Sequence, residues 1–326
     1  MPPVRAGLQW LAKAQEPDGS WSCKRWGGNA DWDLGVTGLS LLAFEGAGYT
    51  HITGTFKETV AKGIQWLRAK QKADGSFGWK TFDEQGIATL AIAEAYGLTE
   101  SRELRSPVQK AIDYIVKVQP VHGGFGPQGP VPKDNGDMLT TTWQILAIRG
   151  AILAGIAVPQ EAVDRSKAFL KSTYRGSGAS ARVVASKDPE PLATALGLFC
   201  RMFLYDAGCE DETRAAADWL RAYHQKSGSA AQGQGRLVGD LDYTYFSAAS
   251  MFMMGLERSE EWMRAYRAPL IAAQVEEEFD AVGRFIRGSW DPTKHHPGDR
   301  YGRVYTTAMA VLPLEGGSGP RSPCRK

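Results

Sequence analysis

The chain contains little cysteine and has no C-x-x-C spacing. Four of its 326 residues are cysteines, and no two of them have the spacing typical of zinc ribbons or dithiol redox sites. A chain of this length can build its core without disulfide bonds. We therefore expect Cys23, Cys200, Cys209 and Cys324 to be free thiols.

The chain also lacks excess charge and long apolar runs. Its 38 lysines and arginines are balanced by 36 aspartates and glutamates, so no broad field favours nucleic acid or an acidic membrane. Apolar runs such as Gly38–Phe44 are much shorter than the roughly 18 to 20 residues that span a bilayer, and Met1–Arg5 does not begin a secretory signal. We expect a cytoplasmic protein, unless a leader has been lost, with no nucleic-acid partner and no integral membrane segment. The oligomeric state stays open.

Strand patterns are scarce as well, since stretches such as Ala181–Ser186 are too isolated to build a sheet. What the sequence has instead is a repeated helical phrase that ends in Gln and a Gly-aromatic turn. The clearest copies run from Trp10 through Gln15 to Gly19-Ser20-Trp21, from Trp66 through Gln71 to Gly75-Ser76-Phe77, and from Tyr114 through Gln119 to Gly124-Phe125. Weaker copies near Phe169, Trp219 and Gln274 bring the number of repeats to six.

A second, more apolar helix is predicted in each repeat. These segments are Val36–Gly46, Gly86–Tyr96, Leu139–Leu153, Leu192–Leu204, Tyr243–Met254 and Val304–Leu314. A helix that is apolar all round must be buried on all sides, whereas a striped helix covers it from outside. The sequence therefore predicts an all-α (α/α)6 barrel of six helix-turn-helix repeats, forming one domain over residues 1–315 with a disordered tail at 316–326. An open solenoid is the alternative.

The turn motif resembles a known family. Gln15-x-x-x-Gly19-x-Trp21 resembles the glutamine–tryptophan repeat of squalene-hopene cyclases, and Gln71-x-x-x-Gly75-x-Phe77 is its aromatic variant. In that family the Gln ties a helix end to the next turn, which implies a structural role here. Further phrases, such as Gly288-Ser289-Trp290-Asp291-Pro292, are similar to single-barrel prenyltransferase and squalene oxidase repeat proteins of the terpenoid cyclase and protein prenyltransferase superfamily.

The catalytic motifs that the resemblance would imply are incomplete. No D-x-D-D acid motif occurs, and the nearest segments are Asp31-Trp32-Asp33 and Asp134-Asn135-Gly136-Asp137. Asp240–Phe246 resembles the zinc-binding phrase of prenyltransferases, but Asp242 stands where that family has Cys, and Tyr301-Gly302-Arg303 stands where it has His. We therefore predict no bound metal and no cofactor. His295 and His296 are expected to form an exposed loop pair, although they could join Asp240, Asp242 and Asp291 in a different metal site.

Carboxylates precede nearly every predicted inner helix. If the starts of these helices share one end of the barrel, the carboxylates ring its mouth. Asp33, Asp137 and Asp242 are the preferred catalytic candidates; the alternative is that they only cap helices. The residues expected to line a ligand cavity are Trp32, Trp143, Tyr243, Tyr245, Tyr305 and Arg303. Their aromatic rings could stabilise a cation, or simply pack between repeats.

Three functions fit this sequence. The resemblance favours a barrel that binds or processes a hydrophobic, isoprenoid-type ligand in its centre. A non-catalytic interaction module, like the toroidal thioester domains, is one alternative, although the C-x-E-Q thioester motif does not occur. The other is a carbohydrate-processing (α/α)6 enzyme that uses paired carboxylates. The fold by itself cannot choose among them, because function resides in the site.

Overall fold

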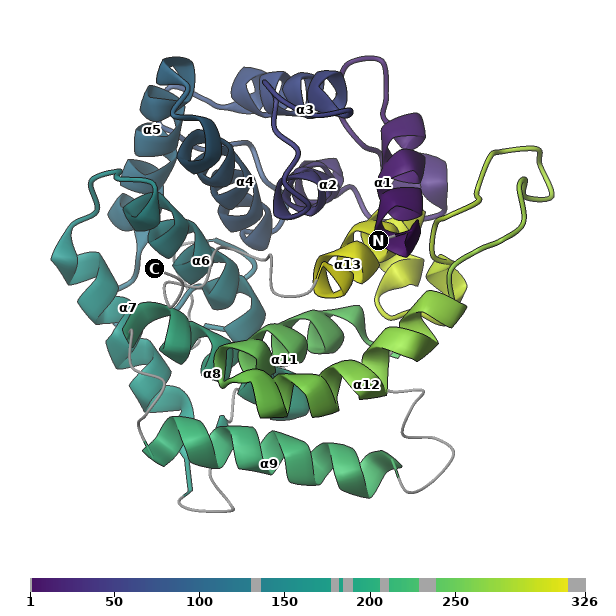
Figure 1. Cartoon of the computed structure of the whole chain (residues 1–326). Helices are drawn as coiled ribbons and strands as arrows, with labels where there is room; N and C mark the ends of the chain where they lie inside the picture. The colour runs from purple at the N-terminus through teal and green to yellow at the C-terminus, as the bar shows by residue number, and fades with distance from the viewer. Residues whose placement is uncertain are drawn as a thin grey trace.

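A computed structural model describes residues 2–129, 136–176, 182–183, 190–205, 211–228 and 239–315, with the side chains of 182, 183, 205, 225–228, 256–259 and 261 excepted. This part of the chain contains twelve α-helices arranged in two concentric rings (Figure 1). The outer helices are α1 (Pro2–Ala14), α3 (Lys57–Lys70), α5 (Arg102–Val118), α7 (Gln160–Thr173), α9 (Asp211–Gly228) and α12 (Leu256–Ala272). The inner helices are α2 (Asp33–Gly46), α4 (Asp83–Thr99), α6 (Met138–Leu153), α8 (Glu190–Tyr205), α11 (Leu241–Met253) and α13 (Gly298–Leu314).

The inner ring is closed. Each inner helix contacts the next in the order α2, α4, α6, α8, α11 and α13, and α13 returns to α2. Each outer helix packs on the inner ring, and the first outer helix, α1, lies against the last inner helix, α13. The predicted six-repeat (α/α)6 barrel is therefore confirmed, including which helices are inner and which are outer, and the open solenoid is excluded.

The burial of the two classes of helix follows from their sequences. All residues of α4 from Asp83 to Ala93 are buried, whereas the outer helix α5 buries a single stripe made by Leu104, Val108, Ala111, Ile112 and Ile115. Small residues let the inner helices approach closely: a Cβ atom added at Gly86 would lie 2.6 Å from the carbonyl carbon of Trp143 in α6. The inner ring is thus the hydrophobic core of the barrel.

The repeated Gln joins neighbouring repeats. Gln15 Nε2 donates to the carbonyls of Gly19 in its own turn and Thr59 in the next outer helix, both at 2.9 Å. Gln274 Nε2 does the same at the seam of the ring, donating to Gly288 O at 2.7 Å and to Pro3 O of α1 at 2.9 Å. The structural role implied by the resemblance is confirmed, and the same contact closes the ring.

The aromatic residue of the turn is buried between the two rings. Trp21 is fully buried, its indole N–H donates to Leu11 O at 2.7 Å, and its backbone N–H donates to the Thr37 hydroxyl of α2 at 3.0 Å. Trp290 repeats this arrangement with Leu270 O at 2.8 Å and the Thr307 hydroxyl at 3.2 Å. Each such turn therefore ties an outer helix to the inner helix of the same repeat.

Other parts of the described chain add little to the barrel. A two-residue strand β1 (Tyr174–Arg175) pairs with β2 (Arg182–Val183), so the stretch expected to be too isolated for a sheet forms only this short ladder. Residues 275–288 project from the ring between α12 and α13 (Figure 1). None of the described helices is long and apolar enough to cross a membrane. The predicted tail at 316–326 lies outside the described residues.

Candidate ligand site at the barrel mouth

The starts of the inner helices meet at one end of the barrel, which we call the mouth. The Trp32 indole N–H, just before α2, donates to the Thr81 hydroxyl before α4 at 2.8 Å. Gln144 Nε2 of α6 donates to Phe82 O at 2.6 Å, and a hydrogen bond from Tyr305 to Asp242 joins α13 to the first turn of α11. The expectation that these N-termini share one end is confirmed for five of the six inner helices.

Three aromatic rings cluster at the mouth. The Trp32 and Tyr301 rings lie 4.3 Å apart, Tyr301 and Tyr305 lie 5.1 Å apart, and Trp32 and Tyr305 lie 6.3 Å apart. All three side chains are buried. We call Trp32, Tyr301 and Tyr305 the mouth cluster. It combines the loop before α2 with two residues in the first half of α13, which lie on either side of the non-helical Gly302.

Asp242 is bound directly to the mouth cluster. Its carboxylate Oδ1 accepts a hydrogen bond of 2.7 Å from the Tyr305 hydroxyl, and the residue is buried. Asp240, not Asp242, caps α11, since Asp240 Oδ1 accepts from the Tyr243 N–H at 3.0 Å. Capping of α11 therefore does not account for a carboxylate at position 242. Burial and the negative charge of Asp242 together raise the pKa of Tyr305 well above its usual range.

The other two preferred carboxylates have different surroundings. Asp137 caps α6, because its Oδ1 accepts from the Thr140 N–H at 2.7 Å. Asp33 lies in the first turn of α2, where its Oδ1 accepts from the Cys23 N–H at 2.7 Å and fixes the preceding loop. The structure brings Asp242 together with the aromatic rings, whereas Asp33 and Asp137 each hold a backbone N–H group. Asp134 lies outside the described residues.

Asp83 is a mouth carboxyl that the sequence did not single out. It is the first residue of α4, it is buried, and its Oδ1 has no hydrogen-bond partner within the described chain. Burial raises the pKa of Asp83, although a hydrogen bond from Thr81 and the charge of Arg300 act in the opposite direction. Burial, then the charges of Asp83 and Asp242, raises the pKa of Tyr301. Asp83 and Asp242 thus both act on the mouth cluster, from different helices.

Glu84, the neighbour of Asp83, has a structural role. Its Oε2 accepts from the backbone N–H groups of Lys80 at 2.6 Å and Thr81 at 3.1 Å, and its Oε1 accepts from Gly35 of α2 at 3.3 Å. Burial raises the pKa of Glu84 to about 7 even though these donors favour the ionised form. The sequence signal for the pair was two consecutive acids at the start of an inner helix; their contrasting environments depend on the packing of α2 against α4.

The remaining aromatic candidates are packed deeper in the barrel. Trp143 of α6 meets Phe246 of α11 with ring centroids 5.4 Å apart, although α8 separates these helices in the ring. Tyr245 packs on the same Phe246 at 4.9 Å. Rings from non-adjacent helices therefore fill part of the barrel centre at this level. Tyr243 is also buried, and burial followed by the charges of Tyr223 and Asp240 raises its pKa.

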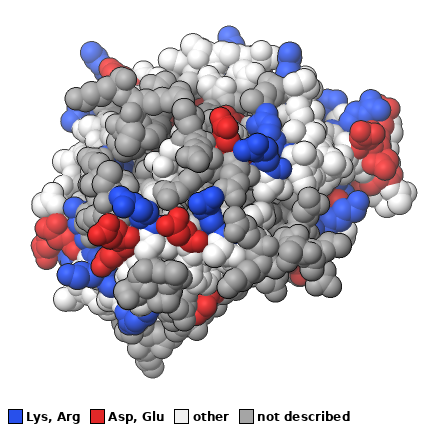
Figure 2. All heavy atoms as spheres, turned by 60° about the horizontal axis from the view of Figure 1, so that its bottom comes forward, with Lys and Arg blue, Asp and Glu red and all other residues white. Residues whose placement is uncertain are grey.

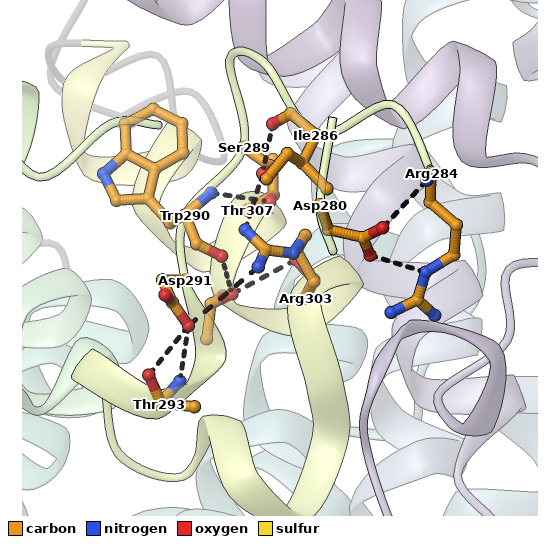
Figure 3. A network of polar contacts seen from close by, with 10 residues as sticks. Asp280, Arg284, Ile286, Ser289, Trp290, Asp291, Thr293, Arg303 and Thr307 are labelled. Carbon is orange, nitrogen blue, oxygen red and sulfur yellow. Dashed lines mark hydrogen bonds and ion pairs between the residues drawn. The ribbon is translucent and has the colours of Figure 1, made fainter. Parts of the chain in front are cut away.

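Arg303 is held by the segment before α13 rather than by the mouth cluster. Its Nη1 donates to the Ser289 hydroxyl at 3.0 Å, and its Nη2 lies 4.0 Å from Asp291 Oδ1 (Figure 3). Asp291 also accepts from the Thr293 N–H at 3.0 Å, as the same view shows. The guanidinium group is therefore part of a polar network that supports the Trp290 turn.

The histidine pair is not fully exposed as expected. His296 is exposed, but His295 is only 4% exposed, so the prediction of an exposed loop pair is wrong for His295. The physical reason is that this segment pairs with the start of α11, where the Leu241 N–H donates to His296 O at 3.2 Å. Within the described ranges, no three His, Cys, Asp or Glu side chains are grouped to hold a metal ion.

On the face drawn in Figure 2, the described acidic and basic side chains are interspersed. Neither sign forms a continuous patch among the residues coloured there. This distribution agrees with the near balance of charges in the sequence.

Comparison with known proteins gives a family and a set of similar folds. Residues 4–126 and 92–289 match the family described as the prenyltransferase alpha-alpha toroid domain. No curated protein matches the chain in sequence.

Similar solved structures include proteins with unrelated substrates. One is a type II terpene cyclase from Scytonema in complex with geranylgeranyl dihydroxybenzoate, with a TM-score of 0.61, 15% identity, and coverage of 98% of this chain and 97% of that one. Another is an alpha-1,6-mannanase from Salegentibacter in complex with alpha-1,6-mannotriose, an inactive variant with two consecutive aspartates changed to asparagine (TM-score 0.61, 10% identity, coverage 97% and 98%). A third is an alpha-amylase from Clostridium perfringens (TM-score 0.63, 11% identity, coverage 97% of both chains). At these identities the likeness concerns the fold alone.

Proposed function

Because the chain belongs to the prenyltransferase alpha-alpha toroid family, we propose that it binds a hydrophobic, isoprenoid-type ligand at the mouth of the barrel. The observation that carries this proposal is the mouth cluster between two buried carboxyls, Asp83 of α4 and Asp242 of α11. The aromatic faces offer apolar contact and can stabilise positive charge that develops on an alkene. Carboxyls beside such rings are suited to give or hold a proton.

The two carboxyls have different parts in this proposal. Asp83 has a raised pKa and an oxygen without a partner in the described structure, so it is suited to hold a proton and donate it. Asp242 accepts the Tyr305 hydroxyl hydrogen bond, so it is suited to orient the ring against the ligand. Asp33 and Asp137 are proposed to fix the mouth through their backbone contacts.

The deeper side chains extend the proposal toward the barrel axis. Trp143, Tyr243 and Tyr245 are buried residues of α6 and α11, and we propose that Trp143 and Tyr245 form an apolar floor below the mouth cluster. Arg303 would then act indirectly, by supporting α13 through Ser289 and Asp291.

A carbohydrate is the second candidate ligand, and one observation favours it. Asp83 and Glu84 are consecutive acids, and the inactive mannanase variant has two consecutive aspartates replaced. Glycosidases use a pair of carboxyl groups, one as acid and the other as base or nucleophile. Glu84, however, already accepts three backbone N–H groups, which leaves Asp83 without a free neighbour for this chemistry. The isoprenoid ligand is therefore preferred.

The test compares two ligand classes on single variants. Binding of geranylgeraniol, squalene and alpha-1,6-mannotriose is measured for the wild type and for Asp83→Asn and Asp242→Asn, with Asp113→Asn on the exposed face of α5 as the matched control. We expect an isoprenoid to bind the wild type and the control, and both mouth variants to lose roughly tenfold or more in affinity with nearly unchanged Tm. Binding of the mannotriose alone, or isoprenoid binding unaffected by both mouth variants, would contradict the proposal.

A further inference from the structure

The opposite end of the inner ring also contains buried carboxyl groups. Glu45 is the penultimate residue of α2, Glu94 lies in the second half of α4, and Glu315 follows the last residue of α13. The charge of Glu94 acts on Glu45, and the charges of Glu315 and Glu94 act on the Tyr245 hydroxyl of α11. Acidic groups of α2 and α4 therefore lie within electrostatic range of each other at the end of the ring opposite the mouth.

Glu45 is buried without any hydrogen bond. Glu45 is only 5% exposed, and neither of its carboxylate oxygens has a hydrogen-bond partner within the described chain. Burying a carboxyl without such partners costs several kcal/mol even in its neutral form, and more when it is ionised. Burial and the negative charge of Glu94 accordingly raise the pKa of Glu45 well above its usual range.

This arrangement is unfavourable for a purely structural residue. The C-terminus of a helix carries partial negative charge, so a carboxylate there is repelled by the helix as well as by Glu94. Small polar side chains of the inner ring can be satisfied within their own helix: the Ser40 hydroxyl donates to Val36 O at 2.7 Å, and the Thr89 hydroxyl donates to Gln85 O at 2.7 Å. Glu45 has no such contact, and an apolar residue would fill its place at lower cost.

We propose that this end of the inner ring is a second binding site, for a ligand that carries a primary ammonium group, with Glu45 as the direct acceptor. An ammonium group provides three N–H donors and a positive charge, which are what the two oxygens of Glu45 lack. Glu94 adds negative potential around it. An organic cation fits better than a metal ion, because no three acidic, Cys or His side chains within the described ranges are grouped to coordinate one.

The site does not depend on the proposed mouth function. Glu45 is in the last turn of α2, whereas Trp32 directly precedes the helix and Asp33 is its first residue. A helix of this length separates its two ends by about 20 Å at 1.5 Å per residue. A ligand bound at Glu45 therefore leaves the mouth cluster accessible, and the two sites can be tested separately.

The experiment uses 1,4-diaminobutane as probe and 1,4-butanediol as its uncharged counterpart of equal length. Titration calorimetry and Tm shifts are recorded for the wild type, for Glu45→Gln, and for Glu58→Gln as the control on the exposed face of α3. We expect the diamine but not the diol to bind the wild type and the control, and Glu45→Gln to weaken binding by roughly tenfold or more. Asp83→Asn should bind the diamine like the wild type.

Folding of the key variant is checked in the same experiment. Glu45→Gln keeps the shape of the side chain and removes its buried ionisable group, so we expect its Tm to equal or exceed that of the wild type. Absence of diamine binding to the wild type, equal binding by wild type and Glu45→Gln, or equal loss in Glu45→Gln and Glu58→Gln would each overturn the proposal. Loss of diamine binding in Asp83→Asn would instead place the ammonium group at the mouth and also overturn it.

Discussion

Asp83 and Glu84 demonstrate how far two adjacent carboxyls can differ. Both start α4 and both are buried. Glu84 accepts three backbone N–H groups and joins α4 to α2, whereas Asp83 has one oxygen without a partner within the described chain. Hydrogen-bond donors around a buried carboxyl offset part of the cost of its ionised form, while a buried carboxyl without them has no such compensation. The chemical interest of the mouth therefore lies in Asp83.

At the residue scale, the raised pKa of Glu84 leads to a predicted pH dependence of the protein's stability. Burial raises its pKa from 4.5 to about 7 in the folded state. A raised folded-state pKa means that the folded protein binds the proton more tightly, so this contribution is complete below about pH 4.5 and is lost as the pH rises through about 7. Its size is on the order of 3 kcal/mol.

The measurement is the free energy of unfolding by urea at several pH values between these limits. Glu84→Gln cannot titrate, so the wild type should lose stability relative to this variant as the pH rises. The variant also loses carboxylate contacts, which lowers its stability by an amount that does not depend on pH in this range. Parallel pH curves for the wild type and Glu84→Gln would contradict the prediction, and Glu58→Gln, exposed on α3, should follow the wild type.

At the element scale, the unit of the fold is the turn between an outer and an inner helix. In the second repeat, Gly75 has a φ of 93°, and a Cβ atom added there would lie 2.0 Å from Lys110 O of α5. The turn is therefore pressed against the backbone of the next outer helix. Gly48 also has a positive φ, of 87°, but no atom lies within 4 Å of an added Cβ. Comparing substitutions at these two glycines therefore distinguishes the effect of backbone strain from that of steric crowding.

Gly75→Ala is predicted to destabilise the barrel more than Gly48→Ala. The positive φ costs about 1 to 2 kcal/mol in either variant. Crowding against Lys110 O should add about 1 to 3 kcal/mol in Gly75→Ala alone, since backbone cannot move aside as a flexible side chain does. Thermal unfolding of both variants measures the difference, and equal Tm values would mean that the turn and α5 can move apart freely.

The buried aromatic of the turn gives a second prediction. Trp21→Ala should lower the free energy of unfolding by about 3 to 5 kcal/mol, because the ring is fully buried and the hydrogen bond from its indole N–H to Leu11 O is lost. Trp66 is half-buried on α3 and bonds Asp18 at 3.1 Å, so Trp66→Ala should cost less. An unchanged Tm in Trp21→Ala would be incompatible with the buried position of this ring.

For the whole molecule, closure of the ring removes the terminal repeats that an open solenoid would have. The first helix, α1, packs on the last, α13, and Gln274 bonds the Pro3 carbonyl. Each repeat therefore has a neighbour on both sides. Because stability in repeat proteins is approximately a sum over repeats and their interfaces, the closing interface adds one term that an open array lacks.

Gln274→Ala tests the closing interface. It removes the bonds to Pro3 O and Gly288 O, and Gln71→Ala removes the equivalent bonds to Pro107 O at 2.9 Å and Gly75 O at 3.5 Å. The free energy of unfolding of each variant should fall by about 1 to 3 kcal/mol relative to the wild type. Similar losses in urea unfolding would indicate a seam as strong as the internal interfaces. A negligible loss in Gln274→Ala beside a clear one in Gln71→Ala would count against closure by this contact.

The sequence by itself determined the architecture. The repeated Gln-Gly-aromatic phrase and the alternation of striped with wholly apolar helices are local patterns, so they could be recognised without coordinates. They predicted six repeats, the two rings and the family, and the structure and the comparisons bear these out. The structural role of Gln15 and Trp21 was also readable, because each contact falls within a repeat or between successive ones.

Only the tertiary structure decided which residues meet at the mouth. Tyr305 and Asp242 come from different repeats, and no local pattern states that a hydroxyl of α13 will reach a carboxylate of α11. The sequence grouped Asp33, Asp137 and Asp242 as equivalent, yet one caps its helix, another fixes a loop and the third contacts an aromatic ring. Helix position is fixed by short-range periodicity, whereas the partners, burial and pKa of a side chain depend on neighbouring helices. Asp83 and Glu45 were therefore visible as acids in the sequence, but not as buried groups without partners.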